Sequence, residues 1–144
     1  MTRDIVHAIE IEAEQKAVYD AIATPSGLAA FWTSDVEGSG SVGETLTFGF
    51  PEAPTRMPIE IARLDAPDEV AWTCPAGYPY WEGTQVSWSV APGEHGTNVV
   101  FRHAGFPDEQ PDFALGSVSL TWAMIVDRLK RVVENGGKAD PYFA

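Results

Sequence analysis

Cysteine is almost absent from this sequence, and basic residues are scarce. Cys74 is the single cysteine, so the chain can form no internal disulfide and no metal site built on several thiolates. Nine Lys and Arg residues stand against 21 Asp and Glu, which gives a formal net charge of −12. Nucleic acids and anionic membrane surfaces attract positively charged proteins. We therefore expect neither of them as a partner.

Long apolar runs are also missing. No segment approaches the roughly 20 apolar residues of a membrane-spanning helix. The first residues, MTRDIVHAIEIEAE, alternate in polarity and lack the apolar core of a signal peptide. No repeat, linker or low-complexity stretch interrupts the 144 residues. Together with the single thiol, these features predict one domain over residues 1–144 and a cytoplasmic location.

Two kinds of periodicity are present instead. Residues 5–12 alternate between apolar and polar, which is typical of a half-buried strand. Helical spacing follows over 14–23, and Pro25 suits the first turn of a second short helix over 25–32. Between residues 33 and 105 only strands and turns are indicated, with strands at 44–50, 57–64, 69–74, 84–90 and 97–103.

The last third of the chain changes to helical spacing. Apolar residues at positions 115, 118, 122, 125, 129 and 132 predict one long helix over 113–134. The segment Asn135-Gly136-Gly137 suits its C-terminal cap. Two prolines in FPDEQPDF (106–113) prevent the helix from starting much earlier.

This order of elements predicts an α+β fold. A curved antiparallel sheet of about six or seven strands would have one apolar face, and the long helix has a matching apolar stripe. We expect the sheet to wrap around that helix while the two short helices support one end. Sheet and helix cannot close along their whole length, so a cavity that binds small apolar ligands is expected between them.

Several segments resemble those of a known superfamily. They are IEAEQKAVYDAIATPSGLAAFW (11–32), GT (96–97), HAGF (103–106) and the end of the chain, GGKADPYF (136–143). They are similar to START-like, Bet v 1-type proteins, and most of all to bacterial relatives of the C-terminal domain of the activator of the Hsp90 ATPase. The resemblance spans essentially the whole chain and implies the helix-grip fold. Members of this superfamily bind hydrophobic small molecules, and some are aromatase/cyclases or assist Hsp90.

The inward strand positions of the predicted sheet are unusually aromatic. Alternation places these side chains on the face that would meet the long helix, which contributes a tryptophan of its own. The predicted ligand-contacting residues are Phe48, Phe50, Met57, Trp72, Trp88, Phe101, His103 and Trp122.

His103 is open to three interpretations. It could hydrogen-bond the backbone where the last strand ends, contact a ligand, or act as a general base. The pattern favours the first and least favours the third, so no catalytic residue is predicted. If the first and last strands pair antiparallel, as the resemblance implies, His7 lies close to His103. The spacings HxH and HExxH do not occur, and no metal site is predicted.

The remaining candidates are a thiol and an aromatic loop. Cys74 falls on an apolar strand face, which indicates a small buried residue rather than a nucleophile. The loop 75–83 contains Tyr78, Tyr80 and Trp81, and exposed aromatic residues can mark a cavity entrance or an interface. The loop makes a homodimer an open possibility.

The sequence therefore predicts the binding of a small hydrophobic or aromatic molecule, with no metal, nucleotide or other cofactor. Two other functions remain open: a polyketide cyclase-like or hydrolase-like enzyme that uses the same cavity, and an interaction module for an Hsp90-type chaperone. The full co-chaperone has a further N-terminal domain with no counterpart in these residues. An Hsp90-type chaperone is therefore not the expected partner.

Overall fold

The computed structural model describes residues 1–53, 55–75 and 80–144, which contain seven strands and three helices. In chain order these are β1 (Thr2–Ile11), α1 (Gln15–Ala23), α2 (Pro25–Phe31), β2 (Asp35–Glu37), β3 (Thr45–Gly49), β4 (Met57–Asp65), β5 (Glu69–Thr73), β6 (Gln85–Gly93), β7 (Gly96–Pro107) and α3 (Asp112–Glu134). The predicted α+β order, with two short helices after the first strand and a long helix at the end, is confirmed.

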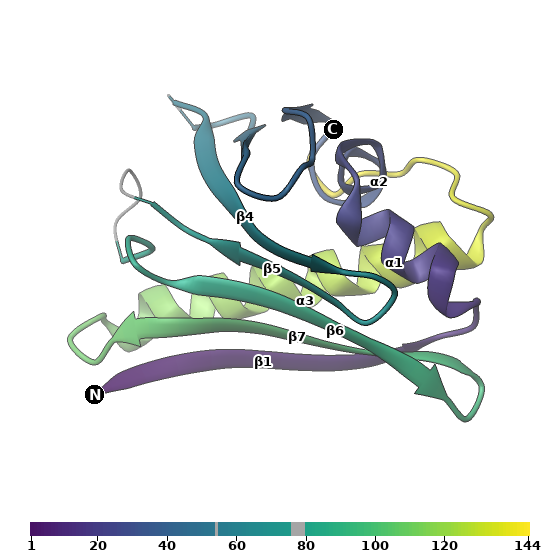
Figure 1. Cartoon of the computed structure of the whole chain (residues 1–144). Coiled ribbons are helices and arrows are strands. Elements are labelled where there is room, and N and C mark those ends of the chain that lie inside the picture. Colours follow the sequence, from purple (N-terminus) through teal and green to yellow (C-terminus); the bar gives the residue numbers. More distant parts are fainter. Residues whose placement is uncertain (54, 76–79) are drawn as a thin grey trace.

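One antiparallel sheet contains all seven strands in the order β1-β7-β6-β5-β4-β3-β2. The first strand thus pairs with the last, which places Ile5 opposite His103 and His7 opposite Phe101. Figure 1 shows the sheet curving across α3, with α1 and α2 beside the C-terminal part of that helix. This arrangement is the helix-grip fold that the sequence predicts.

The junction between α1 and α2 is unusually tight. Thr24 caps α2 because its hydroxyl accepts a hydrogen bond from the Gly27 N–H at 3.0 Å, and Pro25 occupies the first turn. A Cβ atom on Gly27 would collide with the Ala21 carbonyl oxygen. Any other residue at position 27 would therefore push the two helices apart.

The first and last strands are longer than predicted. β1 begins at Thr2 instead of residue 5, and β7 continues to Pro107 instead of residue 103. The added segments pair with each other, Thr2 opposite Pro107 and Arg3 opposite Phe106. Backbone groups gain hydrogen bonds from such pairing whatever the side-chain pattern, so a strand can extend beyond its alternating part.

The hairpin between β6 and β7 is shorter than the turn expected over residues 91–96. It consists of residues 94–95, because β6 runs to Gly93 and β7 begins at Gly96. Gly96 has a φ of +144°, and a Cβ atom there would collide with the Ile11 carbonyl oxygen. The absence of a side chain lets the hairpin pack against the end of β1.

The inner stripe of α3 is fully buried over only part of its length. Trp122, Ile125 and Leu129 are buried against the sheet, as the spacing predicts. Leu115 and Val118, which lie earlier on the same stripe, are only half-buried. The helix thus packs closely along its second half and leaves space at its start. No helix in the described ranges is both long and apolar enough to cross a membrane.

Candidate ligand-binding cavity

A cavity of about 300 Å³ lies beside the first half of α3. Its walls come from α3, the end of α2, the segment between β3 and β4, the residues before β6 and the C-terminal tail. The lining residues are Trp32, Phe50, Met57, Trp81, Ser117, Val118, Thr121, Trp122, Ile125 and Phe143. None of these carries a charge and five are aromatic, so the cavity suits an apolar ligand.

Trp32 forms the inner wall at the C-terminal end of α2. Its ring stacks on Trp72 with a centroid distance of 5.9 Å and an interplanar angle of 9°. It also contacts Phe48 at 4.4 Å and Trp122 at 5.1 Å. With partners on several sides and 2% of its surface exposed, the ring is held in one orientation.

His103 holds two other walls in place. The Trp122 indole N–H donates to His103 Nδ1 at 3.1 Å, and His103 Nε2 lies 2.8 Å from Thr84 Oγ1. Because an indole nitrogen can only donate, Nδ1 is unprotonated and the ring proton resides on Nε2. The Thr84 hydroxyl in turn donates to the Trp81 carbonyl oxygen at 2.6 Å. This chain of hydrogen bonds connects Trp122 on α3 to Trp81 before β6.

Burial keeps the His103 imidazole neutral. The side chain is fully buried, and desolvation lowers its pKa from 6.5 to about 3. Trp81 packs edge-on against the ring at 4.5 Å, and Phe106 contacts it at 4.4 Å. Both ring nitrogens are engaged in hydrogen bonds, so His103 acts as a positioning residue for the cavity walls.

Three of the eight predicted ligand-contacting residues line the cavity: Phe50, Met57 and Trp122. The other five lie deeper in the core, where Trp32 and Trp122 pack onto them, and are Phe48, Trp72, Trp88, Phe101 and His103. For these five, direct contact with a ligand stays a prediction.

Several lining residues were not predicted. Trp81 belongs to the loop that the sequence identified as an entrance or an interface, and it stacks near Trp122 with a centroid distance of 6.2 Å. Phe143 ends the segment GGKADPYF that carries part of the family resemblance, but no pattern placed it at the cavity. It reaches the cavity because the tail runs along α2, where Phe143 N donates to the Trp32 carbonyl at 2.8 Å and Tyr142 N donates to the Phe31 carbonyl at 3.0 Å.

The two strand histidines have separate partners. His7 stacks on Phe101 at 6.4 Å, and its Nε2 lies 3.0 Å from the carbonyl oxygen of Ser119 on α3. It therefore joins β1 to the helix, whereas His103 joins α3 to the residues before β6. Within residues 1–53, 55–75 and 80–144, no three His, Cys, Asp or Glu side chains are grouped as metal ligands.

The thiol and the loop tyrosines complete the predicted candidates. Cys74 is 4% exposed, and burial raises the pKa of its thiol, which disfavours the nucleophilic thiolate. Tyr80 is exposed at the surface. Tyr78 lies outside the described residues.

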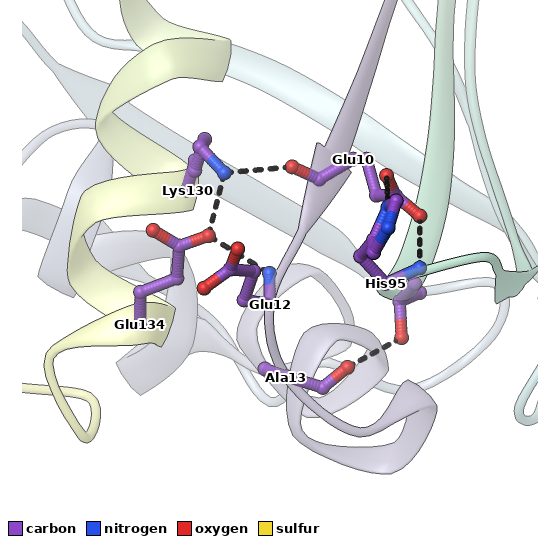
Figure 2. Close-up of polar contacts among 7 residues, drawn as sticks. Glu10, Glu12, Ala13, His95, Lys130 and Glu134 are labelled. Carbon is purple, nitrogen blue, oxygen red and sulfur yellow. Dashed lines mark hydrogen bonds and ion pairs between the residues drawn. The ribbon is translucent and has the colours of Figure 1, made fainter.

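Polar contacts join the C-terminal half of α3 to the sheet (Figure 2). We call the residues that make these contacts the polar clamp, and they are Glu10, Glu12, His95, Lys130 and Glu134. Lys130 Nζ donates to the Glu10 carbonyl at 2.8 Å and to Glu134 Oε2 at 2.6 Å. The Glu12 N–H also donates to Glu134, at 2.8 Å. Lys130 and then this N–H lower the pKa of the Glu134 carboxyl. The His95 N–H donates to Glu10 at 2.7 Å and lowers the pKa of that carboxyl.

Comparison with known proteins gives one family and many similar folds. The family model for activator of Hsp90 ATPase homolog 1-like protein matches residues 12–134. The solution structure of the Aha1 dimer from Colwellia psychrerythraea has 31% sequence identity and a TM-score of 0.82, over 93% of this chain and 98% of that chain. No curated protein matches the sequence.

Two further solved structures share the fold at lower identity. A crystal structure of a protein from Staphylococcus saprophyticus has 21% identity and a TM-score of 0.77, over 98% of both chains. DynU16, a protein in the dynemicin biosynthetic locus, has 20% identity and a TM-score of 0.76, over 96% of this chain and 50% of that chain.

Proposed function

We propose that this chain, which belongs to the family of activator of Hsp90 ATPase homolog 1-like proteins, binds a small, uncharged aromatic molecule in the cavity beside α3. The family resemblance seen in the sequence motifs is confirmed. The observation that carries the proposal is the lining of about 300 Å³, whose described residues include five aromatic rings and no charged side chain. Ligand sites of proteins have volumes from roughly 300 Å³ upwards.

The lining also indicates which polar group the ligand carries. Each aromatic pair adds about 0.5–1.5 kcal/mol beyond the burial of its area, so a ring bound among Trp32, Trp81 and Trp122 is favoured. The Thr121 hydroxyl donates to the Ser117 carbonyl oxygen at 3.0 Å, which leaves its oxygen free to accept a hydrogen bond. A ligand with a hydroxyl or N–H group on its aromatic ring fits this arrangement.

The proposal is binding rather than conversion of the ligand. The described lining residues include the hydroxyls of Ser117 and Thr121 and no carboxylate, imidazole or amine. General acid–base catalysis needs such a group in contact with the reacting atoms. His103 was the histidine that the sequence offered as a possible general base. Its side chain is fully buried, and both of its ring nitrogens already make hydrogen bonds.

Titration with 1-naphthol, followed by tryptophan fluorescence, tests the proposal. Saturable quenching is expected, whereas 1-naphthalenesulfonate should bind at least tenfold more weakly, because no cation among the described lining residues can pair with its charge. Val118→Phe, which fills the cavity, should weaken naphthol binding by at least tenfold. Val100→Phe makes the same change on the exposed sheet surface and should leave binding unchanged.

Equal effects of the two variants would overturn the proposed location of the site. An absence of saturable quenching in the unmodified protein would overturn its proposed chemistry, because 1-naphthol presents both the ring and the hydroxyl that the lining is proposed to recognise.

We also propose that the protein pairs with a second copy of itself. The relative from Colwellia psychrerythraea was solved as a dimer, at 31% identity over 93% of this chain. Sedimentation velocity at increasing protein concentration tests this pairing, with a species of twice the 15.6 kDa chain mass as the expected result.

A further inference from the structure

The outer face of α3 carries exposed apolar side chains at helical spacing. Phe113 is 89% exposed, Leu120 62% and Met124 41%. Residues separated by four or seven positions lie on one side of a helix, and the solvent side of a surface helix is normally polar. We call these three residues the α3 stripe. Such an exposed apolar stripe indicates contact with another surface.

A hollow of about 340 Å³ interrupts the same face and is lined by Ala123, Met124, Asp127, Arg128, Arg131 and Tyr142. The Tyr142 hydroxyl lies 3.5 Å from Met124 Sδ, and the Arg128 guanidinium lies 5.9 Å from the Tyr142 ring centroid. Arg131 holds the Asp127 carboxylate at 3.1 Å. A thioether, an aromatic ring and guanidinium groups form a favourable seat for another aromatic ring.

We propose that the α3 stripes of two copies pack antiparallel, so that Phe113 of each copy enters the hollow of the other. Phe113 and residue 127, in the middle of the hollow, are each seven positions from Leu120. A two-fold axis at Leu120 therefore places Phe113 of the first copy opposite the hollow of the second, and Phe113 of the second copy opposite the hollow of the first. An interface in which both copies use the same surface in this way is isologous. Both features lie about 10 Å from that axis along the helix.

Charged side chains flank the α3 stripe at both ends of the helix. Asp108 and Asp112 mark the N-terminal end, and the Asp112 carboxylate is 97% exposed. Arg128 and Arg131 mark the C-terminal end, where the Arg131 side chain is 67% exposed. Within one copy these groups already have partners, because Asp112 pairs with Arg3, Arg128 with Asp140 and Arg131 with Asp127. The antiparallel direction is therefore inferred from the positions of Phe113 and the hollow on α3.

This inference rests on the proposed pairing and adds its surface and register. It does not depend on a bound ligand, although the two regions are neighbours. Ser117, which lines the cavity, lies between Phe113 and Leu120 on the helix surface. A second copy on the α3 stripe would therefore lie beside the rim of the cavity.

Disulfide trapping tests the register in the full chain. The only native thiol, Cys74, is buried, so an introduced cysteine is the single exposed one. Leu120→Cys, at the two-fold axis, should form a covalent dimer on oxidation. Val42→Cys, which is 57% exposed at a site before β3, should stay monomeric under the same conditions. Equal yields from the two variants would overturn the interface.

Sedimentation velocity tests the contact of Phe113 with the hollow. Phe113→Asp should raise the dimer dissociation constant at least tenfold, while Val42→Asp should leave it unchanged. A dimer that withstands Phe113→Asp overturns the inferred surface but keeps the pairing. A strictly monomeric unmodified protein overturns both, and 1-naphthol binding, measured separately, decides the ligand proposal in either case.

Discussion

The two halves of α3 meet the sheet in different ways. Along the first half, the rings of Trp32, Trp81 and Trp122 surround a cavity, and Val118 is only half-buried. Along the second half, Leu129 is fully buried and the polar clamp joins the helix to β1. The first half thus leaves a cavity, and the second half provides close packing.

This difference separates the open part of the helix from the part that packs closely. The rings of Trp32 and Trp81 lie tilted and stacked, at centroid distances of 5.1 Å and 6.2 Å from Trp122, and all three rings line the cavity. A cavity can remain among them only if the rest of the helix is firmly held. Close packing and the polar clamp hold α3 at the far end, and the hydrogen bonds of His103 hold the rings.

The largest expected effect comes from the closely packed half. Leu129→Ala should lower the free energy of unfolding by about 3 kcal/mol, because it leaves a void in a region that is fully buried. Leu115→Ala makes the same change on the half-buried start of the helix and should cost about 1 kcal/mol. Urea denaturation measures both variants. Equal losses would remove the distinction between the two halves.

The second largest effect is expected in acid, where ionisation of His103 in the unfolded chain should lower the free energy of unfolding. His103 stays neutral in the folded protein, with a pKa of about 3, whereas a histidine of the unfolded chain titrates near about 6.5. Below that value protons bind the unfolded chain preferentially, so stability is lost as the pH falls towards 3. Between about pH 6.5 and pH 5 the loss should be about 2 kcal/mol.

Urea denaturation at the two pH values measures this loss. His103→Gln, which cannot ionise, should lack it, while His95→Gln at the exposed turn of the polar clamp should retain it. An unchanged pH dependence in His103→Gln would show that the buried imidazole is not its source.

The smallest effect is expected at the polar clamp. Glu134→Gln should lower the free energy of unfolding by about 0.5–1 kcal/mol, because the ion pair with Lys130 is only partly shielded from water. Part of this difference should disappear in about 1 M salt. Asp20→Asn, which breaks the more exposed pair with Lys16, serves as the control and should have the smaller effect. If Asp20→Asn lowers the free energy of unfolding as much as Glu134→Gln does, the polar clamp contributes no more stability than an ordinary surface ion pair.

Periodicity was sufficient to predict most of the fold. Alternation located the strands to within a few residues, and the spacing of residues 122, 125 and 129 identified the buried side of α3. The errors lie at strand ends, as at Thr2 and Pro107, where backbone pairing continues without a pattern in the side chains.

The candidate site was predicted less completely. Strand parity told which side chains face inward but not how deep each would lie, so Phe48 and Phe50 were grouped although only Phe50 lines the cavity. Phe143 could not be predicted because no local pattern places the C-terminal tail along α2. Its position depends on hydrogen bonds between segments more than 100 residues apart in the sequence.

The sequence by itself determined the kind of protein. Its alternating and helical patterns specify which surfaces must be buried, and burial of apolar surface is largely indifferent to the detailed fit of the side chains. The tertiary structure alone decided where packing fails to close, and which nitrogen of His103 carries the proton. Those features depend on the contact of residues from distant segments, and contact distances of a few ångströms are not encoded in any local pattern.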